Sequence, residues 1–280
     1  MLPTMSCTTV TAPAVADPPD PGFAAVRPLL RRLTGDEKHE ASAYSTLDVI
    51  WVLYDRVLRV APDQVDAVDR DRFLLSKGHG PAPYYAVLAA KGFIPEEWLD
   101  DLAGPASRLG HHPDRLLVPG VEIGSGSLGH GLGLGVGTAL GLRAQGLTGE
   151  PRPRGYREPR VYVLLGDAEL DEGSNHEAIA YAGACRLASL TAVVVDNQSA
   201  THSWAAAWPG TQALYGSVPT YGLDTAPAES MGIAARFVVN GWTAAIVNGR
   251  DHDAIEAGLT SHDNQRPHCV IVRVESKHRA

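Results

Sequence analysis

Two short apolar segments, each followed by a polar residue, constrain the fold of this 280-residue chain more than any other feature. Residues 161–165 and 190–195 are rich in β-branched side chains and are predicted to form buried strands. Asp167 follows the first segment, and Asn197 follows the second, 30 residues after Asp167. Residues 174–187 are predicted to form a helix, so the unit is strand, helix, parallel strand. Both polar residues are therefore expected at the carboxyl edge of a parallel sheet, where such folds bind ligands.

The oxygen atoms offered at that edge suit a hard divalent cation. The carboxylate of Asp167 and the amide oxygen of Asn197 are typical ligands of Mg²⁺ or Ca²⁺, and Mg²⁺ commonly takes further ligands from phosphates. Gly166 and Gly173 allow close backbone approach, and a helix beginning near Ser174 directs free N–H groups to the same edge. These features predict a metal-bridged diphosphate. On spacing alone, turn chemistry at Asp167 and a loop role for Asn197 remain an equal alternative.

With its flanking residues, this motif resembles the thiamine diphosphate motif of the transketolase family. Glu172-Gly173 and Glu177 follow Gly166-Asp167 as they do in that family. Four further segments resemble the family's N-terminal half and occur in the family's order. They are residues 71–79 (DRFLLSKGH), 107–113 (SRLGHHP), 119–122 (PGVE) and 126–131 (GSLGHG). The resemblance extends over roughly residues 25–275.

The resemblance implies that the chain binds thiamine diphosphate together with Mg²⁺, for which Ca²⁺ can substitute. The implied metal ligands are the side chains of Asp167 and Asn197 and the backbone carbonyl of Ser199. Leu128 would pack against the aminopyrimidine ring of the cofactor. The full set of implied cofactor contacts is His79, Gly126, Ser127, Leu128, Gly166, Asp167, Ala168 and Asn197.

The resemblance also implies catalytic roles for His79, His112, His39, Glu172 and Glu177. His79 and His112 would stabilise a developing alkoxide and move protons, a role for which the imidazole group is generally suited. Glu172 and Glu177 resemble acidic residues at the family's subunit contact, and their alternative role is favourable charge at a helix N-terminus, about 0.3–1 kcal/mol. His39 falls where the family has a histidine in a glycine-rich turn, although no glycine flanks it here.

The implied reaction is the transfer of a two-carbon ketol unit from a ketose to an aldose, using the carbanion that thiamine diphosphate supplies. The chain ends at Ala280, about where the family continues into a pyrimidine-binding domain that carries the cofactor-activating glutamate. We therefore expect the N-terminal subunit of a split transketolase, whose partner is a separate C-terminal subunit, with a heterotetramer as the assembly. The alternatives are a thiamine-dependent carboligase or decarboxylase component acting on an α-keto acid, and a degenerate, non-catalytic subunit.

Three residues depart from the family pattern and motivate those alternatives. Ala168 stands where the family motif has glycine, which the fold tolerates only if this backbone does not need a positive φ. His111 replaces a glycine before His112 and would narrow the substrate entrance. His130 stands where the family usually has glutamine. Arg108 is the one well-placed cation for a substrate phosphate in this chain, but the family's phosphate specificity depends heavily on the other half, so Arg108 does not decide whether the substrate is phosphorylated.

Glycines recur at four-residue intervals at positions 129, 133, 137 and 141. Each glycine in a helix costs up to about 1 kcal/mol relative to alanine. A helix over residues 128–142 is therefore expected to pack closely on a partner helix, and we consider it a candidate for the subunit interface. A glycine-rich loop is the alternative. His130 and Arg143 bound the apolar stretch too closely for a membrane span.

Composition limits the class of protein further. The net charge of −8 argues against a nucleic-acid partner and favours a small-molecule substrate, which the family resemblance implies is a sugar or a keto compound. The three cysteines form no CxxC pair, which suits a reducing cytoplasm. Residues 1–26 are predicted to be a flexible tail without a secretory signal, and residues 27–280 to form one α/β domain, a doubly wound, mostly parallel sheet with helices on both faces. Four histidines are expected at the surface, and these are His176, His202, His252 and His262.

Overall fold

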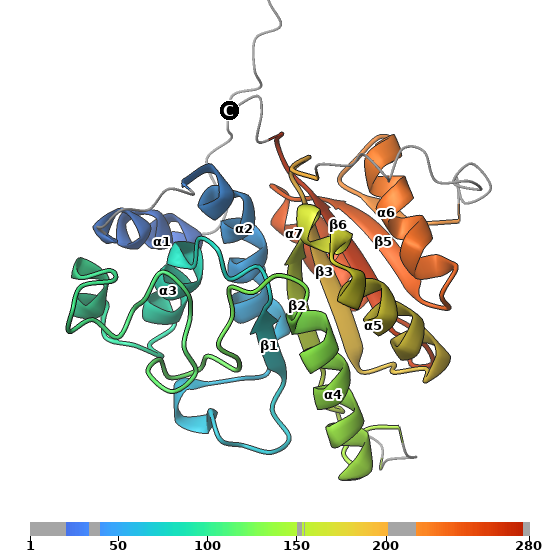
Figure 1. The fold of residues 1–280 in the computed structure, drawn as a ribbon, viewed down its shortest axis with the longest axis horizontal. Helices are drawn as coiled ribbons and strands as arrows, with labels where there is room; N and C mark the ends of the chain where they lie inside the picture. Colours follow the sequence, from blue (N-terminus) through green and yellow to red (C-terminus); the bar gives the residue numbers. More distant parts are fainter. Residues whose placement is uncertain (1–20, 34–39, 150–152, 154, 201–216, 277–280) are drawn as a thin grey trace, which may run out of the picture.

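The computed structural model describes residues 21–33, 40–149, 153, 155–200 and 217–276. Its centre is a six-stranded sheet with the order β1-β2-β3-β6-β5-β4, in which every neighbouring pair is parallel (Figure 1). The strands are β1 (Arg72–Leu75), β2 (Val161–Gly166), β3 (Leu190–Asp196), β4 (Thr220–Tyr221), β5 (Thr243–Asn248) and β6 (His268–Arg273). The strand order reverses between β3 and β6, which is typical of a doubly wound α/β fold.

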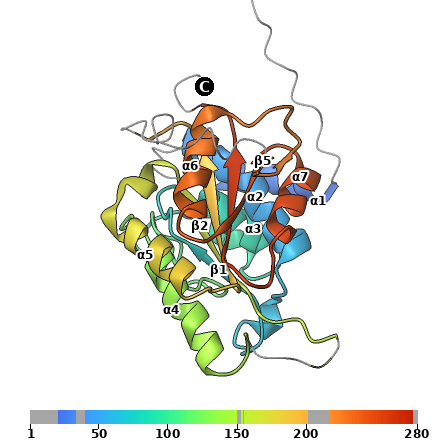
Figure 2. The same cartoon turned by 90° about the vertical axis from the view of Figure 1, so that its right-hand side faces the viewer.

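Helices cover both faces of this sheet (Figure 2). The apolar side chains of α1, α2, α3 and α7 pack on one face, and those of α4, α5 and α6 on the other. The helices are α1 (Pro21–Arg32), α2 (Glu40–Val52), α3 (Ala82–Ala90), α4 (Gly131–Ala144), α5 (Gly173–Ala184), α6 (Ala228–Val238) and α7 (His252–Thr260). All seven residues of β3 are buried, because successive side chains enter opposite cores. The predicted fold class is thereby confirmed.

The shorter helical segments lie in the connections between these elements. They are η1 (Leu53–Val57), η2 (Pro62–Gln64), η3 (Glu96–Asp100) and η4 (Ala168–Asp171). The last of these directly follows β2, at the edge of the sheet where polar residues were expected. Within the described ranges, no helix combines the length and apolar character that crossing a membrane requires.

The predicted tail ends too late in the sequence. Residues 21–26 form the first half of α1, and the side chains of Phe23 and Val26 are fully buried. The ring of Phe23 lies 6.0 Å from that of Trp51 and 4.5 Å from that of His252. Since His252 is buried beneath α1, its expected surface position is also wrong. One aromatic anchor in a stretch rich in Pro and Ala was too weak a sequence signal to place this helix.

The helix predicted from the glycine repeat is present as α4, but its close contacts involve other glycines than expected. A Cβ atom added at Gly135 would lie 2.4 Å from Cγ2 of Val163, so the helix packs directly on β2 at that point. A Cβ atom at Gly133, Gly137 or Gly141 would meet no described atom within 4 Å. A Cβ atom at Gly129, the first glycine of the repeat, would lie 2.6 Å from Oγ of Ser174 in α5, so the described chain supplies a partner helix at that position of the repeat and not at the other three.

Substituting the packed glycine of α4 and substituting an open one should change stability in opposite directions. Gly135→Ala should lower the free energy of unfolding by about 1–2 kcal/mol, because the clash with Val163 outweighs the gain in helix propensity. Gly137→Ala, the matched control on the open side, should raise it by about 0.5–1 kcal/mol. Urea unfolding of both variants measures the difference. Stabilisation by Gly135→Ala would contradict the close packing of α4 on β2.

Candidate functional site

Parallel pairing of β2 and β3 brings Asp167 and Asn197 to the same edge of the sheet. Gly166 lies opposite Val195 in the register, and the backbone N–H of Asp167 donates to the carbonyl oxygen of Val195 at 3.0 Å. Both polar residues are buried, with exposed fractions of 4% for Asp167 and 3% for Asn197. The predicted strand, helix, parallel strand unit is confirmed, with α5 as its helix.

The carboxylate of Asp167 is surrounded by hydrogen-bond donors. Its Oδ1 accepts from the N–H of Ala168 at 2.9 Å and from Oγ of Ser199 at 2.6 Å. Its Oδ2 accepts from the N–H of Ser199 at 2.7 Å and from that of Ala200 at 3.2 Å. None of these described partners carries a positive charge. Asp167 is thus a buried carboxylate held next to Ser199, and among the described residues its hydrogen-bond partners are uncharged groups.

The turn that carries Asn197 is held by side-chain hydrogen bonds before it, at Asp196, and by a left-handed backbone conformation after it, at Gln198. Asp196, at the end of β3, accepts from Oγ of Ser230 at 2.6 Å and from Nη1 of Arg273 at 2.9 Å. Gln198 has a φ of 56°, in the left-handed region that favours glycine, so the chain turns sharply there. Sequence reasoning missed Ser230 and Arg273, because both lie on elements far along the chain.

The oxygen atoms of Asp167 and Asn197 at this edge are suitable ligands for a hard divalent cation. Oδ1 of Asn197 is buried and has no hydrogen-bond partner among the described residues. An unpaired buried amide oxygen costs roughly 1–3 kcal/mol unless a ligand satisfies it. A cation there would satisfy that oxygen and neutralise the Asp167 carboxylate, provided Oγ of Ser199 turns away. The predicted metal ligands Asp167, Asn197 and Ser199 therefore lie in one place with the required chemistry.

Glu169, to which the sequence analysis gave no role, connects three segments of the chain below this edge. Its side chain is 1% exposed. Oε1 accepts from Oγ of Ser76 and from the N–H of Gly129 at 3.0 Å, and Oε2 accepts from the N–H of Gly166 at 3.3 Å. Burial raises the pKa of this carboxyl above its usual range. In the sequence, Glu169 is one of several acidic residues of a helical turn, so only the tertiary structure separates it from them.

The predicted catalytic histidines His79 and His112 meet at the same edge. Their rings are in contact edge to face, with centroids 5.1 Å apart and an interplanar angle of 84°. Gly126 has a φ of 131°, and a Cβ atom there would lie 2.4 Å from Cδ2 of His112. A Cβ atom at Gly78 would lie 2.6 Å from the backbone nitrogen of Gly126. These three loops pack so closely that only glycine fits at both positions.

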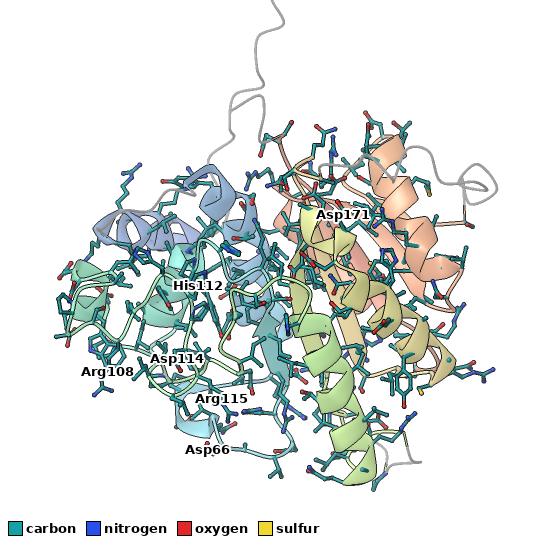
Figure 3. All side chains as sticks on the ribbon, in the orientation of Figure 1. Asp66, Arg108, His112, Asp114, Arg115 and Asp171 are labelled. Atoms are coloured by element: carbon teal, nitrogen blue, oxygen red, sulfur yellow. The ribbon has the colours of Figure 1, made fainter. Side chains whose placement is uncertain are left out.

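The loop cluster is joined to the metal edge through Ser76. Its N–H donates to the carbonyl oxygen of Leu164 in β2 at 2.9 Å, and its Oγ accepts from the N–H of Gly131 at 3.1 Å. Figure 3 shows His112 in the loops beside α3 and β1. The same view places Arg108 at the outer rim of this region, where its guanidinium stacks over Trp98 at 5.0 Å. The described structure thus places Arg108 on the ring of Trp98.

The remaining predicted cofactor contacts lie in the loop before α4. Ser127 is exposed and Leu128 is half-buried. Nδ1 of His130 lies 3.2 Å from the carbonyl oxygens of both residues, so His130 supports this loop rather than lining the helix. Ala168 lies in η4 and does not have a positive φ. The methyl group that replaces the family's glycine is therefore accommodated without backbone strain.

The other predicted residues lie at the surface or outside the description. Glu172 and Glu177 are exposed at the start of α5, and Glu172 occupies its N-cap position without a side-chain capping bond. Glu172 and Glu177 could therefore belong to a subunit contact or could simply supply favourable charge at the helix N-terminus, and both interpretations stay open. His111 and His176 are exposed, and His262 is half-buried. His39 and His202 lie outside the described residues, so their assignments stay predictions.

Comparison with known proteins identifies the family. A family profile described as "Transketolase, thiamine diphosphate binding domain" matches residues 34–210. The chain therefore belongs to the transketolase family, and the matched region contains the histidine pair, the glycine loops and the Asp167 and Asn197 edge.

Individual relatives support this assignment. The chain is 33% identical over 217 residues to a protein of Actinobacillus succinogenes named as one subunit of an apulose-4-phosphate transketolase, covering 78% of this chain and 74% of that protein. It resembles a transketolase mutant from Pichia stipitis with a TM-score of 0.64 and 24% identity, covering 90% of this chain. The chain spans 36% of the length of that solved structure. At 24% identity, this similarity supports the fold alone.

A third relative has an unexpected name. The chain is 47% identical over 246 residues to "Ferredoxin fas2" of Rhodococcoides fascians, covering 88% of this chain and 70% of that protein. Iron–sulfur clusters of the ferredoxin type take four cysteine ligands, and this chain contains three cysteines at scattered positions. These 280 residues therefore do not themselves contain the ligand set that the relative's name implies.

Glu169→Gln tests the role of the buried carboxylate in holding the loops together. The variant should lower the free energy of unfolding by about 1–3 kcal/mol at pH 7, because an amide N–H₂ then faces a backbone donor. The pKa of Glu169 is raised in the folded state, so its stabilising contribution is full below about pH 4.5 and declines as the pH rises through the folded-state pKa. The loss caused by Glu169→Gln should therefore be larger near pH 4 than at pH 7.

Urea unfolding at both pH values provides this measurement. Glu177→Gln serves as the control, because that carboxylate is exposed on the following helix and its substitution should change stability by less than about 0.5 kcal/mol. Equal effects of the two substitutions would contradict a structural role for Glu169.

Proposed function

We propose that this chain is the cofactor-binding subunit of a two-chain, thiamine diphosphate-dependent transketolase-like enzyme, which transfers a two-carbon ketol unit from a ketose to an aldose. The observation that carries the proposal is the buried pair of Asp167 and Asn197, in which one amide oxygen has no described partner and one carboxylate has uncharged hydrogen-bond partners among the described residues. This pair lies inside the region that matches the family's cofactor-binding domain.

The metal would be Mg²⁺ and would be held by Asp167, Asn197 and Ser199. When bound, thiamine diphosphate supplies the nucleophilic carbon that takes up and releases a two-carbon unit. Gly166 and Ala168, on either side of Asp167, would admit the diphosphate close to the backbone. Hard oxygen ligands from the protein leave the remaining positions of the cation to diphosphate oxygens, which accounts for the absence of a larger protein ligand set at this edge of the described structure.

The histidine pair would manage protons beside the reacting atoms. The ring of His79 packs edge to face on that of His112, with centroids 5.1 Å apart. An imidazole held in this way can stabilise a developing alkoxide and pass a proton to or from the substrate. Gly126, Ser127 and Leu128 would form the wall against the cofactor ring, with Leu128 supplying the apolar contact. His39 is assigned to the substrate side of the same site by resemblance.

A separate partner subunit would complete the site. The relative in Actinobacillus succinogenes is named as one subunit of its enzyme, which supports a two-chain arrangement. In this chain the side of α4 that carries Gly137 and Gly141 is open, and helical spacing places Leu134, 48% exposed, beside them. Glu172 and Glu177 are exposed on the neighbouring α5. We assign this surface to the contact with a C-terminal, pyrimidine-binding subunit, in a cytoplasmic heterotetramer acting on a small-molecule sugar or keto substrate.

Calorimetric titration of thiamine diphosphate with Mg²⁺ into the chain, with and without a candidate partner subunit, tests the proposed function. Binding should require Mg²⁺, and Asp167→Asn should weaken it by more than about 100-fold, because the buried metal site loses its charge partner. Asp171→Asn, in the same turn but outside the ligand set, should bind as the unmodified chain does. Binding of equal strength without Mg²⁺, or in Asp167→Asn, would overturn the proposal.

Gly137→Leu tests the assigned partner surface. The substitution enters open space on α4 and removes a helical glycine, so the chain should be at least as stable as before, while association with the partner subunit should weaken by about tenfold or more through steric overlap. Ala25→Leu, an exposed position on α1 at the other face of the sheet, is the matched control. Analytical ultracentrifugation of the mixed subunits measures the association. Equal association of both variants would exclude the open side of α4 from the interface.

A further inference from the structure

A cavity of about 880 Å³ opens at the edge of the sheet opposite the candidate catalytic edge. It lies where α4 and α5 end and where β2 and β3 begin, and its walls include Arg143 and residues 185–189. In Figure 2 the strand arrowheads point towards the top of the view, so this edge is at the lower ends of the strands. The volume lies within the range typical of small-molecule sites, about 300–1,000 Å³.

The walls of this cavity are strongly basic. Four arginines line it, and these are Arg143, Arg157, Arg160 and Arg186. Glu158 is the carboxylate in the described lining, and it accepts a hydrogen bond from the backbone of Gly149 at 3.1 Å. Such a concentration of guanidinium groups contrasts with the net charge of −8 of the whole chain.

These guanidinium groups are mostly not neutralised. Among the described residues, only Arg157 of the four forms an ion pair, at 3.0 Å from Asp71. Nη1 of Arg143 donates to the carbonyl oxygen of Cys185 at 2.9 Å, and Nη2 of Arg160 donates to that of Ala188 at 3.0 Å. These carbonyl groups carry no net charge, although that of Cys185 lies at the C-terminal end of α5, where the helix dipole favours a cation.

Arg160 shows the electrostatic consequence most clearly. Arg160 is only 7% exposed, and Nε of its side chain has no hydrogen-bond partner in the described structure. Tyr162 and Asp71, whose Oδ1 accepts from the backbone N–H of Arg160 at 2.8 Å, offset part of its charge, but burial has the larger effect and lowers the pKa of this arginine. His262 also lines the cavity, and burial together with the charge of Arg160 lowers its pKa to about 4. The cavity therefore has a positive potential that an anion would compensate.

Arg186 adopts a left-handed backbone conformation that is unfavourable for residues other than glycine. Its φ is 49°, and it follows α5 at the place where glycine most often ends a helix. Its N–H donates to the carbonyl oxygen of Gly183 at 3.0 Å, and that of Leu187 to Ala182 at 3.1 Å, which closes the last turn of the helix. Glycine would form this turn with less strain, so the arginine side chain is the feature that distinguishes this position.

We propose that this cavity binds a small organic phosphate or diphosphate, at a site separate from the catalytic edge. Guanidinium groups form paired, charge-assisted hydrogen bonds with phosphate oxygens, and several of them around one cavity suit a multiply charged ligand. The ligand would rest on the carboxyl end of α4 through Arg143. The other end of α4 begins at Gly131, whose N–H donates to Ser76 at the catalytic edge at 3.1 Å. A single helix thus joins the two sites.

Inorganic pyrophosphate is the probe, titrated calorimetrically into the full 280-residue chain in buffer containing EDTA, so that the metal-dependent site is not loaded. We expect saturable binding, and a loss of about tenfold or more in affinity for Arg186→Gly, which removes a guanidinium and relieves the backbone. Arg31→Ala, an exposed arginine on α1, is the control and should bind as the unmodified chain does.

The imidazole of His262 provides a second readout that does not depend on activity. Bound anion should raise its pKa from about 4, because the negative charge favours the protonated ring, and an NMR titration of the ring signals would show this shift. Absence of binding, unchanged affinity in Arg186→Gly, or an unshifted His262 would overturn the proposal. Pyrophosphate binding that is lost in Asp167→Asn but kept in Arg186→Gly would also overturn it, since the probe would then occupy the catalytic edge.

Discussion

The parallel pairing of β2 with β3 is the constraint on which the candidate site depends. It aligns Gly166 with Val195, so that the residues immediately beyond the two strands, Asp167 and Asn197, come together at one edge. A shift of one residue in this register would turn every side chain of the fully buried β3 towards the other core. The hydrophobic packing on both faces of the sheet therefore holds the polar pair in place, although neither residue contributes to the cores.

The two edges of the sheet differ in charge, and each edge contains charged groups whose described partners are neutral. At the carboxyl edge, Asp167 is surrounded by neutral donors, and Asn197 retains an unpaired oxygen. At the amino edge, Arg160 and Arg143 are bonded to backbone carbonyl groups. Because buried charge is unfavourable without compensation, we have proposed a divalent cation with diphosphate at the carboxyl edge and an anion at the amino edge. The same fold can thus present two chemically distinct sites.

Much of the fold and part of the site follow from local sequence patterns. The runs of β-branched residues placed β2 and β3, the glycine repeat placed α4, and the family resemblance placed His79 and His112 in a common region. Predictions were wrong where a local pattern had to be combined with distant contacts. Phe23 lies in a stretch rich in Pro and Ala, and only its burial against Trp51 and His252 reveals the helix. In α4 the repeat identified the helix, but whether a given glycine faces the sheet or open space depends on how the helix is rotated.

The sequence by itself determined the two central strands, the helix between them, the parallel unit that they form and the identity of the polar residues at its edge, because these depend on side-chain periodicity and chain order within a few tens of residues. Only the tertiary structure decided which residues support that edge. Arg273 reaches Asp196 across 77 residues, and Glu169 reaches Ser76 across 93. The basic cavity likewise joins α4, α5 and the segment before β2. Such contacts arise from the packing of remote elements, and no local pattern in the chain encodes them.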